Sequence, residues 1–317
     1  MKKGYICVAV ATLMFSSMEV MLKFIVGELN VIQLSLIRFT LGGLCLLPMA
    51  LNTLKKRGEH LEKKDLAYLT LLGFVGITVS MPVYQLAVFY AGASTVSVLY
   101  SCNPIFTAVL AVFMLKEMMR KNHIAALILQ LLGSLIIINP FDTKIDPTGL
   151  ALIIAATFLF SLYSVMGKHS CAKFGGVVVT CFGFLSGSVF LLLIILLTRV
   201  PAVADLLTQA GLGSFASIPI LDGITLANLP YVLYVSLGVA GVGFCAYFLA
   251  MEYLSASEAS LVYFFKPALA PFLAWLVHGE WISVNMMVGI VCILIGALVS
   301  TLPGIVEAKK LKKQEET

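Results

Sequence analysis

Long runs of apolar residues set the strongest limit on what this chain can fold into. The hydrocarbon core of a bilayer is about 30 Å thick, so a helix that crosses it needs about 20 mostly apolar residues. The sequence offers ten such runs, at about 5–26, 31–52, 66–90, 94–115, 123–139, 148–168, 176–198, 229–253, 256–277 and 283–302. We therefore expect an all-α integral membrane protein with ten transmembrane helices. Eight helices is the alternative count, because two pairs of runs meet at short junctions, around 91–94 and 254–257.

The composition agrees with this class. Of the 317 residues, 60% are hydrophobic and 12% are charged, and the mean hydropathy is +1.03, values outside the range of soluble domains. The net charge of +5 forms no continuous basic stripe, so we expect no nucleic-acid partner. The seven cysteines show no CxxC spacing and the four histidines no HExxH spacing. We therefore predict no disulfide framework, no metal and no cofactor.

The basic residues predict the orientation, because Lys and Arg are retained in the cytoplasmic loops during insertion. The outer loops hold only Lys144 and Arg199. The inner segments hold sixteen basic residues: Lys2, Lys3, Lys55, Lys56, Arg57, Lys63, Lys64, Lys116, Arg120, Lys121, Lys168, Lys173, Lys309, Lys310, Lys312 and Lys313. We expect a multi-pass protein of the cell membrane with both termini in the cytoplasm. Glu19 and Lys23 interrupt the first apolar run, so we interpret it as the first helix and not as a signal peptide.

The chain contains an internal repeat. Adding 163 to a position in the first half reaches the same residue type in the second half, as in Tyr84/Tyr247, Ala93/Ala256, Ser94/Ser257, Tyr100/Tyr263, Pro104/Pro267 and Glu117/Glu280. Nearer the N-terminus the offset is 145, as in Ser16/Ser161 and Gly42/Gly187. The long loop 199–228 accounts for the difference of 18 residues between the two offsets.

Each half therefore holds five predicted helices, and an odd number inserts the second half upside down relative to the first. Inverted repeats are typical of secondary transporters, whose binding site lies between the halves near the midplane. We predict a first repeat at 1–140, a second repeat at 148–303, and a charged cytoplasmic tail at 304–317.

These residues resemble the drug/metabolite transporter superfamily, specifically the EamA type with two five-helix repeats. The resemblance rests on the paired segments 93–117 and 256–280, each followed by a glycine-bearing helix, and on an arginine in the second helix, here Arg38. It covers about 5–303 and is specific for the fold but weak for the substrate. It implies an exporter or importer of amino acids, metabolites or drugs, and the chain has no GxxxxGK[ST] motif for ATP.

Three charged residues lie within the predicted membrane core, where a charge costs about 2.5 to 3.5 kcal/mol on insertion scales. They are Glu19, Arg38 and Lys266, and we expect pairing, water or substrate to stabilise them. One alternative is an internal salt bridge that only fixes the packing of the helices. Another, for Arg38 alone, is that its side chain extends to the membrane interface, because it is near a helix end.

Differences between the two halves mark the predicted site. Thr12, Ser16, Glu19 and Lys23 lie on one face of the first helix, because they recur at spacings of four, three and four. The matching stripe in the second half lacks the acid, and Lys266 takes the place that Asn103 holds in the first half. An added acid and an added base suggest a cavity with opposite charges on its walls, which suits a zwitterion such as an amino acid. A polar stripe that only holds helices together is the alternative.

Tyrosines and prolines complete the candidate set. Tyr84, Tyr100, Tyr247 and Tyr263 are candidate cavity aromatics, with interfacial belt positions as the alternative. Pro104 and Pro267 are expected inside the fourth and ninth helices, with Pro271 a further irregularity. A proline there would release the carbonyl four residues earlier into the cavity, or serve packing alone.

We predict from these features a secondary active transporter, an exporter or exchanger of a small polar metabolite, working by alternating access and not by catalysis. The partners are then a small-molecule substrate and the lipid bilayer, with assembly into a homodimer left open. An intramembrane enzyme is one alternative, although no paired-aspartate or Ser/His arrangement is visible in the helices. A receptor or structural subunit is another, although the loop 199–228 is a poor signalling domain. Glu19 is the expected proton carrier if transport is proton-coupled, the alternative being a permanently ionised group.

Overall fold

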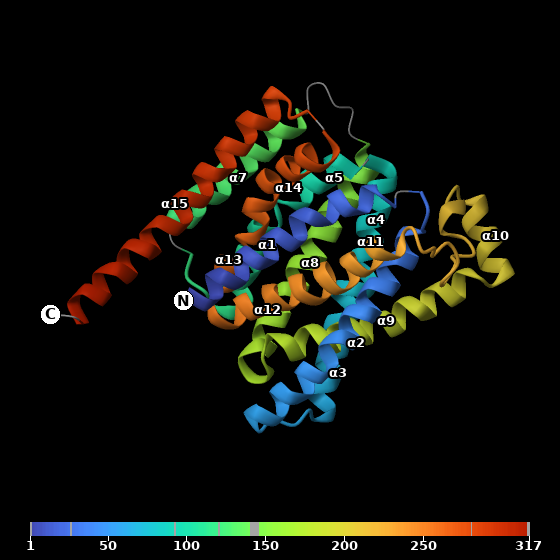
Figure 1. The fold of residues 1–317 in the computed structure, drawn as a ribbon, viewed down its shortest axis with the longest axis horizontal. Helices are drawn as coiled ribbons and strands as arrows, with labels where there is room; N and C mark the ends of the chain where they lie inside the picture. The colour runs from blue at the N-terminus through green and yellow to red at the C-terminus, as the bar shows by residue number, and fades with distance from the viewer. Residues whose placement is uncertain are drawn as a thin grey trace.

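The computed structural model describes residues 2–25, 27–91, 93–119, 121–139, 146–279 and 281–315, and these are helical apart from short connections, with no β strand among them (Figure 1). The elements are α1 (Lys2–Lys23), α2 (Val31–Arg57), α3 (Lys63–Gly73), η1 (Phe74–Val79), α4 (Ser80–Ala91), α5 (Ala93–Tyr100), α6 (Asn103–Leu115), α7 (Lys121–Ile138), α8 (Pro147–Phe174), α9 (Gly176–Thr198), α10 (Pro201–Gln209), η2 (Gly213–Phe215), α11 (Leu229–Leu233), η3 (Tyr234–Gly243), α12 (Phe244–Tyr253), α13 (Ala256–Ala259), α14 (Val262–His278) and α15 (Val284–Glu315).

Eight stretches in the described part of the chain are long and apolar enough to cross a membrane. They are Lys3–Lys23, Val31–Arg57, Lys63–Ala91, Val98–Leu115, Pro147–Phe174, Gly176–Thr198, Leu229–Tyr253 and Ala256–His278. Two shorter apolar helices, Lys121–Ile137 and Val284–Ser300, occupy the places of the remaining two predicted runs. The chain is therefore a multi-pass helical membrane protein.

Two π-helical segments occupy matching places in the two halves. The first, η1, covers 74–79, and adding the repeat offset of 163 gives 237–242, which lies inside η3. The π-helix is a rare conformation that often accompanies functional sites. Met81 and Tyr84 follow η1 within two turns, and Tyr247 follows η3 within one turn or so. Each irregular segment therefore leads into residues near the centre of the bundle.

Glycines let the helices of the two halves cross closely. A Cβ added at Gly73 of α3 would lie 2.2 Å from the carbonyl oxygen of Gly183, and one at Gly187 of α9 would lie 2.6 Å from the Cβ of Ile77. A Cβ at Gly42 of α2 would lie 3.1 Å from the carbonyl oxygen of Ser236 in η3. Gly42 and Gly187 are repeat partners, so equivalent helices use equivalent glycines to approach a π segment of the other half.

The helix breaks differ from the sequence prediction at Pro104. Residues 101–102 form a turn, α6 begins at Asn103, and Pro104 occupies its first turn. Proline is favoured there because the first N–H groups of a helix have no intrahelical partner. Pro104 thus starts a helix where a kink inside one was predicted, whereas Pro267 and Pro271 do lie inside α14.

Helices α7 and α15 lie side by side along one edge of the bundle (Figure 1). Helix α15 continues to Glu315, through most of the predicted tail at 304–317. The sequence after Gly304 has four Lys and three Glu residues, together with one Ala, one Leu and one Gln. These residues have high helix propensity, so the helix extends beyond its apolar part.

Candidate functional site

The predicted acid and base meet inside the bundle. Lys266 Nζ lies 2.6 Å from Glu19 Oε1, with the Lys266 side chain 5% exposed and that of Glu19 27% exposed. This confirms that the two residues approach each other, as their asymmetry between the repeats predicted. Because Glu19 lies on α1 and Lys266 on α14, the ion pair joins the first half of the chain to the second.

Arg38 is the third predicted charge, and it is buried within α2 at 6% exposure. Its Nη1 lies 3.3 Å from the sulfur of Met18 and its Nη2 lies 3.5 Å from the sulfur of Met81. The guanidinium also lies 4.6 Å from the centre of the Phe39 ring. A position at the interface is therefore excluded for this side chain, since it points into the protein.

The four predicted tyrosines form one aromatic cluster. Tyr84 packs edge-on against Tyr100 with ring centroids 4.9 Å apart, and Tyr100 lies 6.1 Å from Tyr263. Tyr263 lies 5.8 Å from Tyr247, whose hydroxyl donates to Ser164 at 3.1 Å. Tyr84 and Tyr100 come from the first half and Tyr247 and Tyr263 from the second, so the rings bridge the halves in the interior.

Ser16 and Asn103 lie in different surroundings. Ser16 is buried with no hydrogen-bond partner for its hydroxyl in the described part of the chain. The side-chain amide of Asn103 donates to Ser161 Oγ at 2.6 Å, and its oxygen accepts from Thr107 at 3.0 Å. Asn103 therefore ties α6 to α8, which leaves Ser16 as the more available of the two polar groups.

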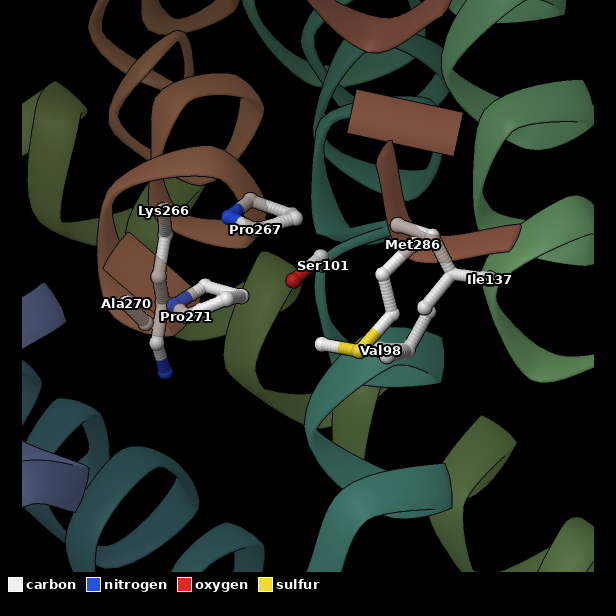
Figure 2. Close-up of a pocket in the computed structure, with 8 residues that line it drawn as sticks. All are labelled: Val98, Ser101, Ile137, Lys266, Pro267, Ala270, Pro271 and Met286. Carbon is white, nitrogen blue, oxygen red and sulfur yellow. The ribbon is translucent and has the colours of Figure 1, made fainter. Parts of the chain in front are cut away.

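A small cavity lies beside the proline-containing part of α14. It encloses about 60 Å³ and is lined by Val98, Ser101, Ile137, Lys266, Pro267, Ala270, Pro271 and Met286. Figure 2 shows the aliphatic part of Lys266 at this cavity, with its nitrogen directed away from Val98 and Met286. The space suits a few water molecules and not a metabolite.

The carbonyl that Pro267 releases has a partner that the sequence did not indicate. Gln130 of α7 is fully buried, and its side-chain amide lies 3.4 Å from the carbonyl oxygen of Tyr263 and 2.7 Å from that of Ser101. The carbonyl oxygen of Tyr263 therefore accepts a hydrogen bond from Gln130. In this conformation the carbonyl joins α14 to α7 and does not line a cavity for a solute. An isolated Gln within an apolar run was the available signal for this role.

The family is decided by a comparison with known proteins. The family model of the EamA-like transporter family matches residues 2–139 and, a second time, residues 147–302. The chain belongs to the EamA-like transporter family. This confirms the resemblance inferred from the repeated motifs, and the two matched ranges cover the two halves of the chain.

Other known proteins resemble this chain over most of their length. An uncharacterized transporter of Clostridium kluyveri is 35% identical over 308 residues, which cover 95% of this chain and 93% of the relative. A probable terminal-alkyne amino-acid exporter of Streptantibioticus cattleyicolor is 25% identical over 251 residues, 79% of this chain and 77% of the relative. One crystal structure superimposes with a TM-score of 0.72 at 18% identity, covering 95% of this chain and 97% of its own, which shows a shared fold.

A second group of polar contacts in this EamA-like protein lies at the end of the bundle that holds the N-terminus, and several of these contacts join the two halves. Lys168 of α8 donates to the carbonyl oxygens of Met251 and, at 2.5 Å, Leu254. Glu117, just beyond α6, accepts a hydrogen bond from the backbone N–H of Ala256 at 2.8 Å. Sequence reasoning did not assign these residues to a common site, because their contacts depend on how the helices meet.

Ion pairs and a hydroxyl contact extend this group. Arg57 at the end of α2 pairs with Glu252 of α12, and the other carboxylate oxygen of Glu252 accepts from the N–H of Gly176 at 2.9 Å. Tyr5 of α1 donates to Glu258 at 3.3 Å. Within the described residues, no group of three or more His, Cys, Asp or Glu side chains is placed to hold a metal.

Proposed function

We propose that this EamA-like protein is a secondary active transporter that moves a small polar metabolite across the cell membrane by alternating access. The observation that carries the proposal is the ion pair between the buried Lys266 and the half-buried Glu19, which joins the two halves. A charge within the membrane is costly, so each of the two groups needs a partner throughout the cycle. At the junction of the halves, Glu19 and Lys266 can pair with each other in the empty site and with a charged solute in the loaded site.

Two inverted five-helix repeats are the mechanical basis of this proposal. Matching π segments and matching glycine crossings in the two halves support it. In such a cycle the contacts of Glu117 and Arg57, which join the two halves, break when the cavity opens towards the N-terminal end of the bundle. The orientation predicted from the basic loops makes that end cytoplasmic, so the described conformation is closed on the cytoplasmic side.

We propose an amino acid or a related zwitterion as the solute. The substrate named for the relative of Streptantibioticus cattleyicolor is a terminal-alkyne amino acid. A zwitterion can replace an ion pair with little change of net charge, its ammonium facing the carboxylate of Glu19. The buried rings of Tyr100, Tyr247 and Tyr263 offer an apolar and polarisable wall for its side chain.

Counterflow in proteoliposomes tests the proposal without an enzyme or nucleotide. Vesicles that hold the purified protein are loaded with one unlabelled compound at a time, drawn from amino acids, amines, nucleobases and small organic acids. Uptake of the same labelled compound is then measured. We expect counterflow of at least one amino acid, and a loss of at least about tenfold in Lys266→Met. The matched control is Lys173→Met, which removes a lysine from a more exposed ion pair. Absence of counterflow for every compound would overturn the proposed function.

A further inference from the structure

Arg38 carries a buried charge that has no carboxylate beside it in the described part of the chain. The ion pairs found there join Arg57 to Glu252, Lys173 to Asp65 and Lys266 to Glu19. The described contacts of the Arg38 guanidinium are two thioether sulfurs and one aromatic ring, and its Nε has no hydrogen-bond partner. A buried guanidinium is costly unless it is paired, so this arrangement calls for an anionic partner.

The charges near Arg38 do not balance without such a partner. Glu19 and Lys266 form a pair with no net charge, which leaves the positive charge of Arg38. The side chains of Tyr84 and Tyr100 are close enough to Arg38 to interact with it electrostatically, and Tyr84 is also close enough to Glu19. Met18, whose sulfur contacts Nη1 of Arg38, directly precedes Glu19 in α1, so the guanidinium and the ion pair lie in the same part of the bundle.

The two methionines are suited to hold the place of an anion. A thioether sulfur is a weak hydrogen-bond acceptor, whereas a carboxylate accepts two parallel hydrogen bonds from a guanidinium. Met18 and Met81 contact different nitrogens of Arg38, Nη1 and Nη2. Methionine side chains are unbranched and repack easily, so both sulfurs can move aside without a change in the backbone.

We propose that Arg38 binds the carboxylate of the transported solute, which replaces the sulfurs of Met18 and Met81 at the guanidinium. This inference rests on the proposed function, because only a transporter would carry the bound solute across the membrane. It deepens that function by defining the substrate class as carboxylates. It assigns the carboxylate of the solute to Arg38 and not to Lys266. The hydroxyl of Tyr100, which is buried without a hydrogen-bond partner in the described residues, is a further donor for the same group.

Acetate is the probe, because it is small enough for any site that recognises a carboxylate. The protein is purified in detergent, and its melting temperature is followed with a thiol-reactive dye, since four of its seven free cysteines are buried. Sodium acetate is titrated against sodium chloride at constant ionic strength, and acetamide serves as the uncharged analogue. We expect a saturable rise of about 2 °C or more with acetate and none with acetamide.

Variants at Arg38 assign the effect to the guanidinium. We expect Arg38→Met to abolish the acetate shift and to melt no lower than the wild type without acetate, since an unpaired buried charge is gone. Arg38→Lys keeps the charge but loses the planar fork, so its shift is smaller. The matched control is Lys55→Met on the same helix: Lys55 is exposed in the last turn of α2, and its loss leaves the acetate shift unchanged.

The outcomes separate this inference from the proposed function. No acetate shift in the wild type, an equal shift with chloride alone, or a shift that persists in Arg38→Met each overturns the inference. An acetate shift that depends on Arg38, in a protein that shows no counterflow, supports the inference for binding while the transport function fails. Counterflow together with an acetate shift that does not depend on Arg38 supports the transport function and overturns the inference about Arg38.

Discussion

Lys266 lies almost entirely inside the protein, and the carboxylate of Glu19 balances its charge. Removal of one partner leaves a buried ion, at a cost of about 3 to 5 kcal/mol. We therefore expect Glu19→Gln to lower the free energy of unfolding by about this amount, and the double variant Glu19→Gln/Lys266→Met to recover most of it. Chemical denaturation of the purified variants measures both changes.

The control for this prediction is the pair of Lys173 and Asp65, whose side chains are 47% and 19% exposed and whose N–O distance is 3.1 Å. An exposed pair contributes about 0 to 1 kcal/mol, so Asp65→Asn should have a small effect. Equal losses in Glu19→Gln and Asp65→Asn, or no recovery in the double variant, would contradict the assignment of Glu19 and Lys266 as a coupled buried pair.

Two glycines of one GxxxG sequence in α9 are predicted to behave differently. A Cβ at Gly187 would lie 2.6 Å from the Cβ of Ile77 and 2.8 Å from the carbonyl oxygen of Gly73, whereas the nearest neighbour of a Cβ at Gly183 is 3.8 Å away. Overpacking costs about 1 to 3 kcal/mol. We expect Gly187→Ala to lower the melting temperature clearly and Gly183→Ala to leave it nearly unchanged. Comparable losses in the two variants would refute the crossing described here.

The sequence indicated the elements better than it indicated their contacts. Apolar run length predicted the helices, because the bilayer fixes the length of a spanning element. The departures of Glu19 and Lys266 from the repeat predicted their approach, because a charge in the membrane needs a partner. The sequence held no signal that Met18 and Met81 would contact Arg38, since apolar side chains recur throughout the helices. The sequence also held no signal for the turn at 101–102, because Pro104 is compatible both with a kink inside a helix and with the start of a new helix.

The orientation of the whole molecule yields a prediction that depends on no single contact. Lys56 lies at the end of α2 between Lys55 and Arg57, in a segment that the loop charges predict to face the cytoplasm. In a variant without the native cysteines, Lys56→Cys should react with an impermeant maleimide only after the cells are opened. Leu212→Cys, in the loop 199–228, is the matched position and should react in intact cells. Labelling of Lys56→Cys from outside would reverse the topology.

Energy coupling also belongs to the whole molecule, because it links a proton or exchange gradient to the movement of the two halves. The chain contains no nucleotide-binding GxxxxGK[ST] sequence, and Glu19 is the acidic residue that pairs with a buried base at the junction of the halves. If Lys266 withdraws from Glu19 when the cavity changes sides, the carboxylate loses its cation and takes up a proton. The return of Lys266 then expels that proton on the other side of the membrane.

Glu19→Gln separates this mechanism from a Glu19 that stays ionised throughout. Glutamine keeps the shape and the hydrogen-bonding capacity of glutamate but does not titrate. Under proton coupling, proteoliposomes with this variant should lose accumulation driven by a pH gradient and still exchange labelled for unlabelled solute. The surviving exchange shows that the variant is folded and binds its solute, so the loss is specific to coupling. Accumulation that persists in Glu19→Gln would rule out Glu19 as the proton carrier and assign it to solute binding or to the stability of the ion pair.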